Sequence, residues 1–239
     1  MVLLIISISI TAFLYSSVGH AGASGYIAVM SLLSIPILLI KPTSLYLNII
    51  VAIISSTQFI QNKHFSFKLF FPFIITSIPM AFIGGYLKLP IEVIKIFMGV
   101  LLLISALFLI FKYKEYEEVK KTNIFLQLFF GALIGLFSGI TGTGGGIFLT
   151  PLILFMGWSK AKIAAGVSAL FILLNSISGI VGYYASHNNS QPLWFLAIPV
   201  IIFGFIGSYL GSKKIQPKTL FIFLGLVLLI ASGKLVFRL

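Results

Sequence analysis

Long apolar segments separated by short polar breaks run through the whole chain, five in each half. They cover roughly residues 2–17, 26–40, 43–60, 67–87, 91–111, 122–138, 147–157, 161–184, 192–211 and 217–237. A helix that crosses a bilayer needs about 20 apolar residues, and several of these segments reach that length. The pattern predicts an all-α polytopic membrane protein with about five helical segments in each half.

Two of the breaks are rich in glycine rather than in charged residues. They are residues 17–25 (SVGHAGASG) and residues 138–146 (SGITGTGGG), the second of which is followed by Pro151. Non-helical backbone is tolerated at membrane depth only where it is buried in protein or lines a cavity. We therefore expect Gly-rich helix breaks at mid-membrane. The apolar segments beside each break are either two short spans or a re-entrant hairpin, and the sequence leaves both arrangements open.

The two halves of the chain repeat these features in the same order. A shift of 120 residues aligns the two glycine-rich breaks and pairs Gly22 with Gly142 and Gly25 with Gly145. A second match pairs residues 82–87 (FIGGYL) with residues 205–210 (FIGSYL). Both matches predict a duplication within a single membrane domain. Its expected parts are repeat 1 (1–111), a connecting loop (112–121) and repeat 2 (122–239).

Composition excludes an ordinary soluble domain, in which about a quarter of the residues are charged. In this chain 59% of the residues are hydrophobic and only 8% are charged. The net charge of +12 does not indicate nucleic-acid binding, because the lysines are scattered through short loops between apolar segments. The chain has no cysteine, which excludes thiol catalysis and thiolate metal sites.

The distribution of basic residues predicts the orientation of the chain in the membrane. If each glycine break returns the chain to its own side, one side carries Lys63, Lys68, Lys112, Lys114, Lys120, Lys121, Lys160, Lys162, Lys213, Lys214 and Lys218. The other side then carries only Lys41, Lys88, Lys95, Lys234 and Arg238. The positive-inside rule makes the loop 112–121 cytoplasmic and places both termini outside. With five segments each, the repeats are inverted, as in many secondary transporters of the cell membrane.

The glycine breaks are also the best candidates for an anion site. A helix that begins near Gly25 or Gly145 directs its unpaired N–H groups and the positive end of its dipole into the break. Anions bind at such helix N-termini. Thr141 and Thr143 add hydroxyl donors in the second half, and Ser24 and His20 are their first-half counterparts. The alternative is that the glycines only permit a tight turn.

Polar residues at helical spacing follow each break. Asn48 and Ser55 are seven residues apart, as are Ser168 and Asn175, so each pair shares one face of a helix. Such residues either line a cavity or join helices by hydrogen bonds. The expected substrate-binding residues are Gly22, Ser24, Gly25, Asn48, Ser55, Thr141, Gly142, Thr143, Gly144, Gly145, Ser168 and Asn175.

The apolar segments lack the groups that commonly carry ion coupling and catalysis. No carboxylate lies near the middle of a segment, which leaves His20 as the candidate proton-coupling group in a glycine break. A histidine that simply bonds to a backbone carbonyl is the alternative. Lys41 either attracts anions to the mouth of a pathway or only determines topology. No enzyme, cofactor or metal motif is present, so we expect neither an enzyme nor a cofactor.

The glycine motif at residues 139–146, followed by Pro151, together with its degenerate copy at residues 19–25, resembles the sulfite exporter TauE/SafE family (TSUP). The resemblance extends over essentially the whole chain. It implies export of sulfite, sulfoacetate or a related sulfur-containing anion across the cytoplasmic membrane.

Two functions are consistent with these features. The first is a secondary transporter in which an anion is held between helix N-termini and released by alternating access. The second is a passive channel or facilitator of the same fold for sulfur oxyanions or small carboxylates, which the lack of intramembrane carboxylates favours. The expected partners are a small anion and the lipid bilayer, and the sequence leaves open whether the chain forms a homodimer.

Overall fold

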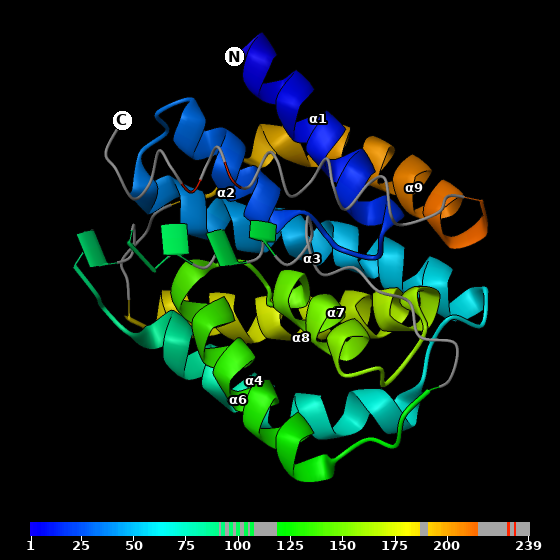
Figure 1. The fold of residues 1–239 in the computed structure, drawn as a ribbon. Helices are drawn as coiled ribbons and strands as arrows, with labels where there is room; N and C mark the ends of the chain where they lie inside the picture. The colour runs from blue at the N-terminus through cyan, green and yellow to red at the C-terminus, as the bar shows by residue number, and fades with distance from the viewer. Residues whose placement is uncertain are drawn as a thin grey trace.

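The computed structural model describes residues 1–90, 119–186 and 191–214, pairs of residues between 92 and 107, and residues 229 and 232. These residues form helices and connecting loops (Figure 1). The fifth apolar segment of each half, residues 91–111 and 217–237, lies largely outside the described residues, as does most of the loop 112–121.

Eight α-helices and one short 3₁₀ helix are present in the described part of the chain. They are α1 (Val2–Ser17), α2 (Ala23–Leu32), α3 (Ile37–Gln61), α4 (Phe67–Tyr86), α6 (Ile124–Thr141), α7 (Gly146–Phe155), α8 (Ala161–Ser186), η1 (Trp194–Leu196) and α9 (Ala197–Lys213). Five of them are long and apolar enough to cross a membrane, namely α3, α4, α6, α8 and the η1–α9 unit. The prediction of an all-helical, multi-pass membrane protein is confirmed.

The boundary between the second and third helices was predicted wrongly. The sequence suggested a break at Lys41 and Pro42, but α2 ends at Leu32 and α3 already begins at Ile37. Ser34 turns the chain with φ 58°, and Pro36 precedes the first helical residue, where its missing N–H costs no helix bond. Pro42 is tolerated inside α3. As a result, Lys41 belongs to a helix and not to a loop.

The helices are arranged in three layers (Figure 1). α3 and α8 pack against each other in the middle, α1 and α9 form one outer pair, and α4 and α6 form the other. Several helix pairs correspond when the two halves are exchanged. α4 packs against α6 and α8 just as α9 packs against α1 and α3, and α2 packs against α3 just as α7 packs against α8.

Glycines bring the helix backbones into close contact. A Cβ atom at Gly139 would overlap the carbonyl oxygen of Ala81, and one at Gly207 would overlap that of Phe13. Small residues have this role in membrane helices because lipid provides no hydrophobic force between helices, so close packing must hold them together.

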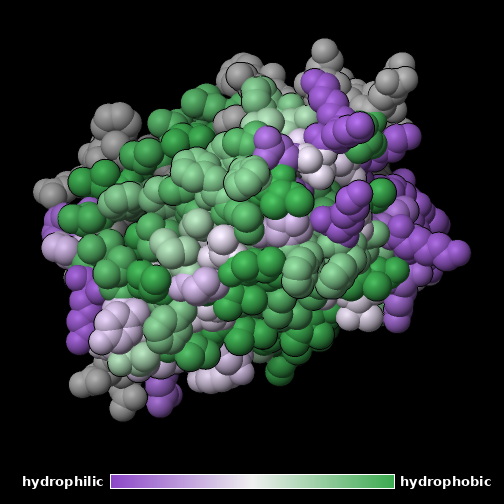
Figure 2. Space-filling view, turned by 90° about the horizontal axis from the view of Figure 1, so that it is seen from below, coloured by the Kyte–Doolittle hydropathy of each residue, from purple (hydrophilic) through white to green (hydrophobic). Residues whose placement is uncertain are grey.

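The loops that carry most of the described lysines meet at one end of the molecule, which we call the basic end. Lys162 Nζ donates to the carbonyl oxygen of Ser212 at 3.3 Å. The amide of Lys120 donates to the carbonyl oxygen of Gly157 at 2.8 Å. The remaining lysines at this end, in the loops or in the adjoining turns of helices, are Lys63, Lys68, Lys121, Lys160, Lys213 and Lys214. Figure 2 shows hydrophilic residues gathered mainly along one edge of a largely hydrophobic face, as expected of a protein in a bilayer.

Two glycines of α8 provide a test of this packing. A Cβ at Gly182 would overlap the carbonyl oxygen of Phe82, whereas one at Gly179 would have its nearest neighbour at 3.6 Å. Gly182→Ala should lower stability by about 1–3 kcal/mol through overpacking. Gly179→Ala should be neutral. Thermal unfolding of both variants in detergent measures the difference, and equal melting temperatures would contradict this view of the crossing.

Candidate functional site

The short helices α2 and α7 each begin directly after a tight turn, which we call the first glycine loop (18–22) and the second glycine loop (142–145). Gly22 and Gly145 are the N-caps, with φ of 106° and 81°. Gly19 and Gly142, at the start of the loops, have φ of 76° and 80°. Only glycine adopts these angles without strain, so both turns depend on it.

The two loops correspond with a shift of 123 residues and not the shift of 120 expected from the sequence. The structure pairs Gly22 with Gly145, because both cap a helix, whereas Gly25 lies inside the first turn of α2. The same shift of 123 relates residues 82–87 to residues 205–210. A shift of 120 would also pair Asn48 with Ser168 and Ser55 with Asn175, and with the shift of 123 these residues are not equivalent.

Asn48, near the middle of α3, joins the two loops. Its Oδ1 accepts a hydrogen bond from the amide of Ala23 at 2.9 Å, at the start of α2. Its Nδ2 donates to the carbonyl oxygen of Thr143 and to Ser176 Oγ, each at 3.2 Å. The side chain is fully buried, and the protein itself occupies both of its polar atoms. In this conformation Asn48 holds the loops together.

The second glycine loop presents a run of unpaired backbone donors. Among the described residues, none accepts a hydrogen bond from the amides of Thr143, Gly144, Gly145, Gly146 or Ile147, and α7 has no side-chain cap. All five residues are buried. Buried amides are nearly always paired in proteins, and these lie at the positive end of a helix dipole. The arrangement suits an anion that accepts several hydrogen bonds.

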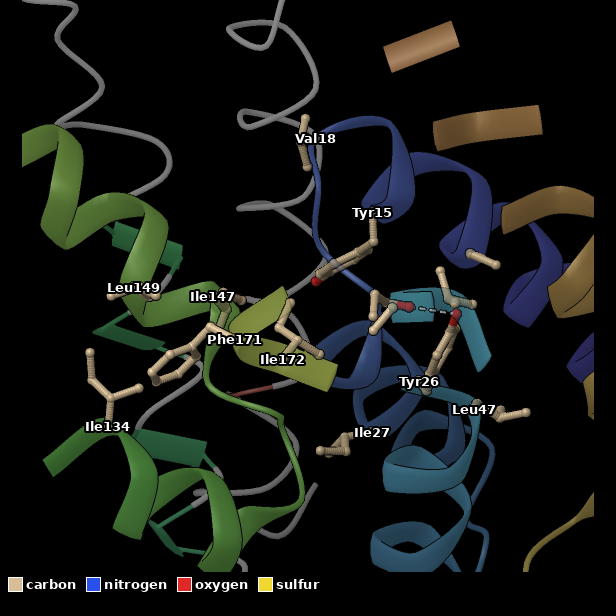
Figure 3. Close-up of a cluster of buried hydrophobic side chains, with 14 of the residues drawn as sticks. Tyr15, Val18, Tyr26, Ile27, Leu47, Ile134, Ile147, Leu149, Phe171 and Ile172 are labelled. Atoms are coloured by element: carbon tan, nitrogen blue, oxygen red, sulfur yellow. Dashed lines mark hydrogen bonds between the residues drawn. The ribbon is translucent and has the colours of Figure 1, made fainter. Parts of the chain in front are cut away.

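Side chains of the protein cover part of the first glycine loop and the start of α2. Asn48 occupies the amide of Ala23, and Tyr26 folds back over the start of its own helix, donating from its hydroxyl to the carbonyl oxygen of Ala21 at 2.8 Å. Figure 3 shows Tyr15 and Tyr26 near this loop, with Ile147, Phe171 and Ile172 on the facing side. At the position equivalent to Tyr26, α7 has Leu149, which offers no such bond.

Two buried hydroxyls flank the starts of α2 and α7 at equivalent positions, 15 and 138. Ser138 Oγ has no hydrogen-bond partner among the described residues, and its Cβ would lie 3.4 Å from a Cβ at Gly145. The hydroxyl of Tyr15 is buried beside Ser24 without a hydrogen bond of good geometry. Sequence reasoning missed both, because only the fold reveals that a hydroxyl lacks a partner.

His20 connects the first glycine loop to α7 and α8. Its Nε2 lies 2.9 Å from Thr150 Oγ1, and Thr150 donates to Ser168 Oγ at 2.7 Å. With Thr150 donating onward, Nε2 is the donor in the first bond. A Cβ at Gly146 would lie 3.7 Å from the His20 ring, so the histidine also adjoins the N-terminus of α7. Thr150 was not among the expected residues.

The other expected residues are only partly gathered around the loops. Thr141 and Thr143 pair through their hydroxyls at 3.0 Å beside the second loop. Asn175 donates to Ser77 Oγ at 3.0 Å and to the carbonyl oxygen of Phe171, one turn away, at 2.9 Å. Ser55 is buried two turns along α3 from Asn48, without a partner among the described residues. The structure thus brings together the second loop, Asn48, Thr141, Thr143 and His20.

Comparison with known proteins gives consistent results. The model of the sulfite exporter TauE/SafE family matches residues 4–235. The chain is 37% identical to probable membrane transporter protein y4hK of Sinorhizobium fredii, over 97% of this chain and 96% of that protein. It is 28% identical to probable membrane transporter protein MJ0441 of Methanocaldococcus jannaschii, over 78% of this chain and 74% of that protein. No solved structure matches.

The bonds of Asn48 predict the effect of its removal. Asn48→Leu keeps the approximate volume but leaves the Ala23 amide and the Thr143 carbonyl unpaired, which should lower stability by about 1–2 kcal/mol. Asn62 is the matched control, because it is partly exposed at the basic end and water can replace its bonds to Gln58 and Ser212. Unfolding in detergent should separate Asn48→Leu from Asn62→Leu, and equal stability of the two variants would refute the joining role.

Proposed function

The chain belongs to the sulfite exporter TauE/SafE family of membrane transporters, and from this premise we propose that it is a secondary transporter that exports sulfite or an organosulfonate across the cell membrane. The observation that carries the proposal is the buried run of unpaired amides from Thr143 to Ile147. Sulfite and sulfonate groups each present three oxygens that accept hydrogen bonds. Such a group would satisfy donors that the protein leaves unpaired.

The surrounding residues suit an anion of this kind. The hydroxyl of Ser138 lies beside the second glycine loop and can donate to the anion. The hydroxyls of Thr141 and Thr143 bond to each other, and Thr141 donates to the carbonyl oxygen of Phe137. The chain contains no aspartate, and no carboxylate adjoins the loop in the part that the structure describes. We assign the second loop, residues 142–145, as the main binding element in this conformation. Asn48 then positions the loops and does not contact the anion.

Gly22, Ser24 and Gly25 at the start of α2 form the equivalent element of the first half. Tyr26 and Asn48 cover part of it in the present arrangement. In an alternating-access cycle the two loops would separate, Asn48 would release one of them, and the uncovered amides of α2 would become available. Movement is required in any case, because the amides of the second loop are buried.

The helix directions support two inverted repeats, 1–111 and 122–239. The glycine contacts make α6 parallel to α4, and both helices start at the basic end. α1 is parallel to α9, which finishes at the basic end, so α1 starts at the opposite one. The α1–α2 and α6–α7 pairs therefore behave as hairpins that enter from opposite ends and meet at Asn48. The positive-inside rule makes the basic end cytoplasmic, with both termini outside.

In a proton-coupled transporter, His20 would be the group that takes up and releases the proton. Its bonds through Thr150 to Ser168 link the first loop to the helices around the second, so protonation at Nδ1 would place a positive charge where the two halves meet. The ring centroids of His20 and Tyr15 lie 6.3 Å apart. The alternative is a passive facilitator of the same fold, in which the histidine is only a structural hydrogen-bond donor.

Transport of sulfite by purified protein in liposomes tests the substrate. Saturable flux is expected, with inhibition by a competing sulfonate. Ser138→Ala should reduce kcat/KM for sulfite by about tenfold, as expected for losing one hydrogen bond to a charged group. Folding should be unaffected, because this hydroxyl bonds to no described residue. Ser31→Ala is the matched control, since Ser31 Oγ is also buried but lies at the far end of α2. Equal loss in both variants would refute the site.

A pH gradient across the same liposomes tests the coupling. A coupled transporter should accelerate when the gradient is imposed, and His20→Gln should keep saturable flux while losing this acceleration. Flux of the wild-type protein that ignores the gradient would favour the passive facilitator and remove the coupling role of His20.

A further inference from the structure

Lys41 is a buried cation that none of the roles above uses. Only 5% of its surface is exposed, in the second turn of α3. A charged side chain inside a membrane protein is costly, faces the interior or a water-filled cavity, and marks an ion pathway more often than a structural site. Lys41 lies near the start of α3, away from the lysines at the basic end, which account for topology by themselves.

The stem of Lys41 lies against the second glycine loop. A Cβ at Gly142 would be 3.1 Å from Lys41 Cγ. Ser44 Oγ bonds to the carbonyl oxygens of both Lys41 and Gly142, at 2.9 and 3.1 Å. Lys41, Ser44 and Asn48 share one face of α3, at i, i+3 and i+7. Ser44 and Asn48 on this face donate to the carbonyl oxygens of Gly142 and Thr143. Lys41 therefore adjoins the same loop that carries the unpaired amides.

Among the described residues, the Lys41 ammonium has an aromatic ring as a neighbour but no carboxylate. The ammonium lies 5.2 Å from the centroid of the Tyr183 ring, a distance at which a cation–π interaction is favourable. No described carboxylate forms an ion pair with it, and the chain has only four acidic residues in all. A mobile anion would complete the neutralisation.

A cavity opens at the end of the molecule opposite the basic end. It has a volume of about 530 Å³ and is lined by Tyr86, Leu87, Lys88, Ala185 and Ser186. The crossing of α4 and α8 brings the Tyr183 backbone within 3.0 Å of a Cβ placed at Gly85. Tyr183 therefore lies on the segment of α8 that lines this cavity at Ala185 and Ser186, and Lys41 lies both over its ring and against the second glycine loop.

We infer that Lys41 is a substrate-binding residue that holds a small oxyanion between the Lys88 cavity and the second glycine loop. The ammonium supplies the full charge that backbone amides lack, and Tyr183 orients it. The inference rests on the proposed function in needing an anion at this loop, but it does not depend on the anion being sulfite.

The test compares variants that differ in charge at one position. Wild-type protein, Lys41→Met, Lys41→Gln and Lys41→Arg are purified, checked by size-exclusion chromatography and titrated with sulfite, sulfate, phosphate and acetate at constant ionic strength. Thermal stabilisation reports binding, and liposome flux reports transport. Lys41→Met and Lys41→Gln should weaken anion binding by about tenfold or more, because a hydrogen bond to a charged group is lost. Lys41→Arg should keep an anion affinity within a few-fold of that of the wild type. Lys160→Met, at the basic end, should keep the wild-type affinity.

Each outcome bears on one of the two proposals. Wild-type affinity in a folded Lys41→Met or Lys41→Gln variant overturns the role of Lys41, even if sulfite is transported. Stabilisation of the wild type by phosphate or acetate alone, lost in the uncharged variants, supports Lys41 and removes the sulfur substrate. Failure of every anion to stabilise the wild-type protein overturns the inference. Using both Met and Gln keeps the test decisive if one of them misfolds.

Discussion

The cost of an unpaired backbone amide away from water governs this structure. Helices satisfy their own amides, which is why the described part of a chain with 59% hydrophobic residues is helical apart from its connections. The two glycine loops are exceptions at the centre of the fold. Asn48 satisfies one amide of the first loop, whereas the five from Thr143 to Ile147 keep no acceptor among the described residues. A site that tolerates this cost is prepared for a ligand that removes it.

One face of α3 organises the region around these amides. Lys41 brings a charge, Ser44 fixes the carbonyl of Gly142, and Asn48 ties the second loop to the start of α2. α3 therefore connects the start of α2 in the first half to the second glycine loop in the second half. A change in the bonds of Asn48 would alter both loops together, which is the kind of linkage that alternating access requires.

Much of the fold follows from the sequence, because apolar length and glycine composition are local properties. The all-helical architecture and the long apolar helices of the described residues were predicted correctly. The start of α3 was predicted wrongly. In the sequence Pro42 suggests a helix break, whereas in the structure α3 begins directly after Pro36 and contains Pro42. The shift between the loops was missed because glycines recur every three residues at 19, 22 and 25, so that alignments three residues apart look alike. The positive φ angles of Gly22 and Gly145, the N-caps of α2 and α7, identify the shift of 123 residues. The unpaired hydroxyl of Ser138 and the surroundings of Lys41 depend on packing, which the sequence does not specify.

The most direct measurement is to locate the anion. Selenite is a heavier analogue of sulfite, and its anomalous scattering can be mapped in crystals of the wild-type protein. The account predicts a peak within hydrogen-bonding distance of the amides of Gly145, Gly146 and Ile147, near Ser138. A peak bound only elsewhere, or protein saturated with selenite while these amides stay unpaired, would contradict it.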